Sequence, residues 1–198
     1  MKNLIVICLV LFIATVQSPF SYSQTVSSKE QVFNLTIQNA VLTSDKTMEF
    51  DLYLKSLDPK DPFELALFQA CILLDPVFCA GGEIKVTLDS GVSELNENQK
   101  PQAVIFSKET NSIKLPSRTL KPATQNTSTD KARGTIISSK GKGTLLCRII
   151  ITNSIAFPKV TKPLSFNFSK QPYPTLVSRY KEGLNTPLTC NEKNCMVK

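Results

Sequence analysis

The chain of 198 residues contains no histidine and no tryptophan. The absence of histidine excludes Ser-His-Asp and Cys-His nucleophilic catalysis, general acid-base catalysis by imidazole, and His-ligated zinc. The absence of tryptophan removes the largest aromatic side chain from any surface that stacks against a sugar ring. An enzyme built on this sequence would have to use carboxylates, Lys, Tyr or Cys, so no catalytic residue is expected.

Glycine is scarce, with 7 residues, whereas the 12 prolines and the many Thr, Ser and Asn residues favour strands and turns over helices. The hydrophobic content of 41% and the charged content of 20% are ordinary for a globular protein. The length suits one domain with its own core.

Long apolar runs are also rare. Residues 4–16 form the one long run, which is shorter than the roughly 20 residues that a membrane-spanning helix needs. Lys2 precedes this run, and the small residues Ser21 and Ser23 follow it. This pattern predicts a signal peptide over residues 1–23. The mature protein is then expected to be exported, to an extracellular, cell-surface or periplasmic location, and not to span a membrane.

Five cysteines follow the predicted signal peptide, and an odd number leaves at least one thiol unpaired or bonded to another chain. Cys190 and Cys195 can close a small loop in a polar tail, residues 190–198, and Cys71 and Cys79 flank a turn and form a second candidate disulfide. Neither spacing is the two-residue gap of a zinc knuckle, so no metal or other cofactor is expected.

Charge is distributed unevenly along the chain. Residues 24–111 carry 7 Lys or Arg against 13 Asp or Glu, whereas residues 112–198 carry 15 against 3. Interleaved strands would partly cancel this asymmetry, whereas a basic face would attract an anionic partner. No nucleic-acid partner is expected, because no aromatic-basic motif of a known module is present. The candidate anionic contacts are Arg118, Lys121, Lys131, Arg133, Lys140 and Lys142.

Apolar residues alternate with polar ones in several segments. In residues 49–55, Phe50, Leu52 and Leu54 share one face, which is typical of a half-buried strand. Residues 63–74 are apolar on both faces and predict a central strand covered on both sides. Similar patterns occur at Phe33, Leu35 and Ile37, at Ile84, Val86 and Leu88, at Ile113 and Leu115, and at Leu164, Phe166 and Phe168.

A further strand is predicted over residues 144–152, after Gly141 and Gly143. Alternation places Leu145, Cys147, Ile149 and Ile151 on one face, with Arg148 on the other. Cys147 is therefore expected to be a buried, unpaired thiol. Eight or nine short strands separated by Pro and Gly turns predict an all-β sandwich.

Several polar and aromatic groups offer weaker candidate sites. Asp51, Asp58 and Asp61 can supply oxygen ligands to calcium, although a solvated Asp-Pro turn is the favoured interpretation. Glu94 with Glu97, or Asp45 with Glu49, can be imagined as a glycosidase pair, but such a pair is defined by its spatial separation. The phenolic rings that remain for sugar stacking are Tyr53, Tyr173 and Tyr180.

Five segments in this order carry a resemblance to a known family. They are 48–56 (MEFDLYLKS), 66–78 (ALFQACILLDPVF), 137–153 (ISSKGKGTLLCRIIITN), 172–180 (PYPTLVSRY) and 183–189 (GLNTPLT). The chain resembles the cohesin-like β-sandwich modules, related to some carbohydrate-binding modules, of exported proteins from bacteria that use type IX secretion. The resemblance implies a jelly-roll-like sandwich over residues 24–189 and supplies no catalytic residues.

The expected function is therefore a non-catalytic exported module that binds or scaffolds a protein partner or a component of the cell envelope. Carbohydrate binding, with a polysaccharide as partner, is the alternative. An enzyme without histidine chemistry is the third possibility.

Overall fold

The structure is a computed structural model that describes residues 33–117, 134–181, 184–190, 195 and 197. These residues form an all-β fold with no helix, so none of them forms a helix able to cross a bilayer. The predicted signal peptide lies outside the described residues. The strands are β1 (Phe33–Ser44), β2 (Thr47–Ser56), β3 (Leu65–Leu74), β4 (Ile84–Asp89), β5 (Ile105–Ser107), β6 (Ser112–Leu115), β7 (Thr144–Asn153), β8 (Leu164–Phe166), β9 (Leu176–Lys181) and β10 (Leu184–Pro187).

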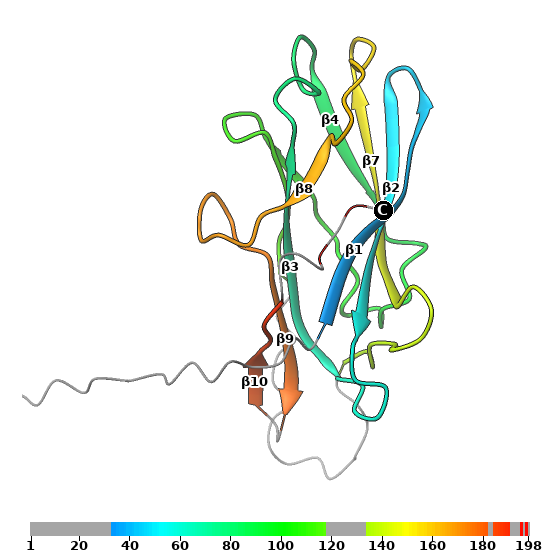
Figure 1. Ribbon diagram of the computed structural model, residues 1–198, viewed down its shortest axis with the longest axis vertical. Coiled ribbons are helices and arrows are strands. Elements are labelled where there is room, and N and C mark those ends of the chain that lie inside the picture. The colour runs from blue at the N-terminus through cyan, green and yellow to red at the C-terminus, as the bar shows by residue number, and fades with distance from the viewer. Residues whose placement is uncertain (1–32, 118–133, 182–183, 191–194, 196, 198) are drawn as a thin grey trace, which may run out of the picture.

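The strands form two antiparallel sheets, so the predicted all-β sandwich is confirmed, with ten strands where eight or nine were expected. One sheet has the order β1-β2-β7-β4 and the other has the order β10-β9-β3-β6-β5. The short strand β8 also pairs with β3, beside Ile72–Leu74, while β9 pairs with the earlier half of β3. Figure 1 shows the two sheets as two layers, with β3, β8 and β9 in one and β1, β2 and β7 in the other.

The core between the sheets follows the predicted alternation. Leu35 and Ile37 of β1 and Leu52 and Leu54 of β2 are completely buried. β3 is buried on both faces, as predicted for a central strand, since Ala70, Cys71 and Ile72 are all inaccessible to solvent.

The predicted inward face of β7 is wrong at one position. Cys147, Ile149 and Ile151 pair with Leu52, Phe50 and Met48 and are buried in the core. A register shift then occurs between Leu52 and Tyr53, so Leu146 is the buried residue and Leu145 pairs with Tyr53 on the outer side. A β-bulge of this kind reverses the faces of the β7 residues before Cys147, which strict alternation cannot anticipate.

Thiol reactivity offers a test of this core. Burial, with a smaller contribution from the Asp51 carboxylate, raises the pKa of the Cys147 thiol to about 12. Burial and the nearby Asp75 raise the pKa of the half-buried Cys79 to about 11. In native protein that begins at Gln24, iodoacetamide should therefore modify Cys79 first and Cys147 only as the protein unfolds. Peptide mass spectrometry over time measures both rates, and early modification of Cys147 would contradict the buried assignment.

Candidate binding groove

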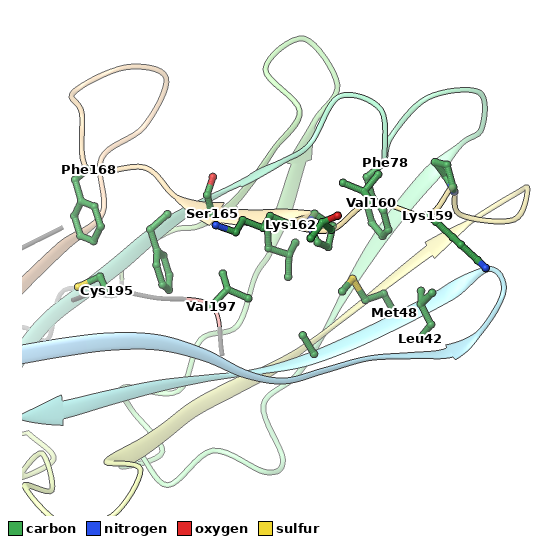
Figure 2. Close-up of a pocket in the computed structure, with 16 residues that line it drawn as sticks. Leu42, Met48, Phe78, Lys159, Val160, Lys162, Ser165, Phe168, Cys195 and Val197 are labelled. Atoms are coloured by element: carbon green, nitrogen blue, oxygen red, sulfur yellow. The ribbon is translucent and has the colours of Figure 1, made fainter. Parts of the chain in front are cut away.

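An open groove of about 1,000 Å³ lies between the edges of the two sheets. β1 is the outermost strand of its sheet, and β8 has no strand beyond it among the described residues. One wall consists of side chains from β1 and β2, and the other consists of residues 158–166 together with Phe168. This volume is within the range of ligand pockets in proteins. Figure 2 shows Phe168 and Cys195 toward one end of the groove and Lys159 and Leu42 toward the other.

The walls of the groove are apolar and its charged groups are cationic. Met48, Phe78 and Leu164 are buried at its base. The polar side chains among the described lining residues are two amines and two hydroxyls, and no carboxylate is among them. They belong to Lys159, Thr161, Lys162 and Ser165. The groove is therefore suited to an apolar ligand that carries negative charge.

Two described residues of the C-terminal tail contribute to the groove. A disulfide joins Cys190 to Cys195, which is the first of the two disulfides that the sequence allows. Cys195 and Val197 both line the groove, and Val197 forms a parallel β-bridge with Ile37 of β1. The tail therefore meets the same strand edge that forms one side of the groove.

The second candidate disulfide, between Cys71 and Cys79, is wrong, because both residues are free thiols. Cys71 lies on the outer face of its sheet, where Ser112 and Asn167 hydrogen-bond to it, whereas Cys79 packs against the core. The spacing of these cysteines around a turn is suitable for a bridge, but β3 directs one of them away from the core.

Tyr53, a candidate for sugar stacking, and Lys142, a candidate anionic contact, lie together in a polar cluster on the outer face of the four-stranded sheet. The Asp51 cluster consists of Asp51, Arg148, Asn39, Tyr53 and Lys142. Arg148 Nε donates to Asp51 Oδ1 over 2.8 Å, and Asn39 Nδ2 donates to Asp51 Oδ2 over 2.6 Å. Lys142 Nζ lies 3.4 Å from Asn39 Oδ1 and 5.6 Å from the centre of the Tyr53 ring.

The Asp51 carboxylate is 2% exposed, yet it remains easily ionised. Burial tends to raise its pKa, but the hydrogen bonds from Arg148 and Asn39, together with the positive charge of Arg148, outweigh this effect and lower the pKa of Asp51. Because both carboxylate oxygens are already bonded, the cluster ties β1, β2 and β7 together and does not present a vacant ligand site.

The other predicted site residues do not come together within the part of the chain that the structure describes. Arg118, Lys121, Lys131 and Arg133 lie outside the described residues, and Lys140 is exposed in the turn before β7. Lys142 covers the Tyr53 ring, whereas Tyr173 and Tyr180 belong to the opposite sheet and its loop. The Tyr173 hydroxyl bonds to Gln69 Oε1 over 3.3 Å. The three rings therefore do not form one sugar platform.

Several of the candidate calcium and glycosidase carboxylates have structural partners. Asp58 accepts the backbone N–H groups of Lys60 and Asp61, as expected for a turn. Glu94 accepts the backbone N–H of Leu145 over 2.7 Å, and Glu97 pairs with Lys100. No group of three or more metal-type side chains occurs within the described part of the chain.

Comparisons with known proteins give a likeness of structure and none of sequence. No family profile matches the sequence, and no curated protein matches it. The structure is similar to a chain in the crystal structure of a type I cohesin–dockerin complex from Clostridium thermocellum. The sequence identity is 11% and the TM-score is 0.47, and the match covers 85% of this chain and 90% of that chain.

The groove itself was missed in the sequence because its walls come from separate segments. Two signals were available. Val41 and Leu42 are consecutive apolar residues that follow the strand predicted at Phe33, Leu35 and Ile37, and both are about half exposed. Lys159 and Lys162 lie between Pro158 and Pro163, among apolar residues. Neither signal alone indicates that the two segments face each other.

Proposed function

We propose that this chain is a non-catalytic binding module that holds a protein partner by an apolar segment placed in the groove. The observation that carries this proposal is the open apolar groove between the β1 and β8 edges, with two lysines and no carboxylate among its described lining residues. Buried apolar walls with a few charged groups at the rim are the usual features of a recognition surface.

The chemistry of the groove favours binding over catalysis. Its polar groups are amines, hydroxyls and the sulfur of a disulfide. No carboxylate among the described lining residues could serve as an acid, a base or a nucleophile beside the lysines. Carbohydrate binding receives less support, because the three tyrosines are not assembled on one surface.

Export by the signal peptide of residues 1–23 is part of this proposal. In a location outside the cytoplasm the Cys190–Cys195 disulfide would persist, and Cys195 would stay in place beside the groove. A partner in the cell envelope and passage through the type IX route are proposed together with it, on the resemblance of the sequence segments described above.

A peptide selection tests the proposed function. Protein comprising residues 24–198 is used to select binders from a random peptide library, and their affinities are measured by fluorescence anisotropy. Leu42→Gln should weaken the selected peptides at least tenfold, because it places an amide in the apolar wall. Leu42 is 49% exposed, so the fold should tolerate this change.

Leu184→Gln provides the matched control. Leu184 is 69% exposed on β10, outside the groove, and its replacement should leave affinity unchanged. If no peptide is selected, or if the selected peptides bind the Leu42 variant as tightly as the wild type, the groove is not the binding surface and the proposal fails.

A further inference from the structure

We infer that the partner segment binds as an added β-strand along the outer edge of β1, with alternate apolar side chains in the groove and a carboxylate at Lys159 or Lys162. This inference rests on the proposed function and specifies its mode of binding and the chemistry of the partner. Strand addition gives affinity through main-chain hydrogen bonds and specificity through alternate side chains.

The edge of β1 is available where the groove runs beside it. β1 pairs with β2 on one side, and residues 39–44 have no backbone partner on the other side within the described part of the protein. These six positions span about 20 Å at the rise of a β-strand. Ala40 and Leu42 line the groove, so a strand added here would lie directly beside its apolar wall.

One residue near the C-terminus already pairs with β1. Val197 forms a parallel β-bridge with Ile37 of β1. The regular pairing of β1 with β2 is interrupted just beyond this point, after Gln38. Cys195 and Val197 both line the groove. The bridge at Val197 therefore shows that a second backbone can pair with this edge of β1 beside the groove.

Charge identifies the chemistry of the partner. Lys159 and Lys162 are exposed and line the groove, and no carboxylate among the described lining residues neutralises them. Figure 2 shows the Lys159 side chain directed toward the β1–β2 hairpin and Lys162 nearer the middle of the groove. An apolar strand with Glu or Asp at one end of its inward face complements this arrangement.

A second copy of the chain fits this edge less well than a separate partner. The pairing of β1 with β2 shifts register between Gln38 and Val41 and again between Leu42 and Ser44. Asn39 also has a positive φ of 55°. Bulges of this kind twist an edge and oppose flat pairing between two identical strands.

The probe is the capped peptide Glu-Thr-Val-Thr-Val-Thr-Val-Thr-Glu, which places Glu and Val on one face. Two derivatives are compared with it. One carries backbone N-methyl groups on the Val residues, and the other carries them on the flanking Thr residues. In an added strand, alternate N–H groups point toward β1 and away from it. One derivative should therefore bind at least tenfold more weakly, while the other stays within about twofold of the parent peptide.

The charge requirement is tested with the doubly substituted protein Lys159→Gln/Lys162→Gln and with a peptide in which Gln replaces Glu. The substitutions should weaken the Glu peptide about fivefold at low salt and leave the Gln peptide unchanged. If both peptides respond equally, the acidic partner is wrong.

The outcomes separate the two levels of the proposal. Strand addition is overturned if the two methylated peptides bind with equal affinity. If Leu42→Gln still abolishes binding of the parent peptide in that case, the groove remains the binding surface. A concentration-dependent dimer in sedimentation, lost in Leu42→Gln, overturns the partner and makes a second copy the occupant. Tight binding of an anionic lipid vesicle, with no binding of the parent peptide, overturns both levels.

Discussion

Replacing Gly143 with alanine should lower the free energy of unfolding by about 3 kcal/mol. Gly143 has a φ of 99°, in a region that side chains with a Cβ rarely adopt. A Cβ at this position would clash with the backbone oxygen of Leu54, which belongs to the neighbouring strand β2. The substitution therefore combines backbone strain with a contact that the sheet cannot relieve without moving β2 away from β7.

Gly141→Ala in the same turn is the matched control. Gly141 also has a positive φ, of 52°, but a Cβ there would meet no atom within 4 Å. Its replacement should cost only about 1 kcal/mol, since the left-handed conformation is the whole penalty. Urea denaturation followed by circular dichroism measures both variants. Equal losses would show that the contact with Leu54 contributes nothing.

Replacing Asp51 with asparagine should lower the free energy of unfolding by about 2 kcal/mol at neutral pH. The change leaves the guanidinium of Arg148 without its charged partner while Asn39 loses its acceptor. Because the Arg148 side chain is 37% exposed, water can partly replace the lost interaction, which limits the penalty. The control is Asp61→Asn, whose 73% exposed side chain pairs with Arg179 over 3.4 Å and should contribute less than about 0.5 kcal/mol.

The effect of Asp51 should also depend on pH in a defined direction. The pKa of Asp51 is lower in the folded protein than its ordinary value of 3.8. Its contribution to stability is therefore complete above that value and is lost as the pH falls through the lower folded pKa. The difference in stability between wild type and Asp51→Asn should shrink between about pH 5 and pH 2. A difference that stays constant over this range would contradict the assignment.

The predictable part of the structure is the part that depends on local alternation. Phe50, Leu52 and Leu54 are buried as a two-residue period requires, and the doubly apolar segment that contains β3 is a central strand. The prediction from alternation fails at Leu145 because of the bulge in the β2–β7 pairing. A bulge depends on how two strands pair, so the sequence of one strand alone does not reveal it.

The candidate site was less predictable than the strands, because it is formed by contacts between distant segments. The groove is lined by residues from three regions of the chain, among them Leu42, Lys162 and Val197. These regions come together only because the β1 and β8 edges of the two sheets lie on the same side of the sandwich. Likewise, Tyr53 and Lys142 were assigned to different ligands from their side-chain types alone, and the fold places one over the other.

The pairing of β2 with β7 also bears on the time course of folding. Asp51 and Arg148 are 97 positions apart, and Gln69 of β3 reaches Pro174, which is 105 positions away. Neither sheet can close until most of the chain has been synthesised, and domains dominated by such non-local pairing fold in milliseconds to seconds. Both sheets are therefore incomplete until β7 and β9 have left the ribosome. That delay suits the proposed export, because a translocation channel that admits only unfolded polypeptide would receive it before either sheet had formed.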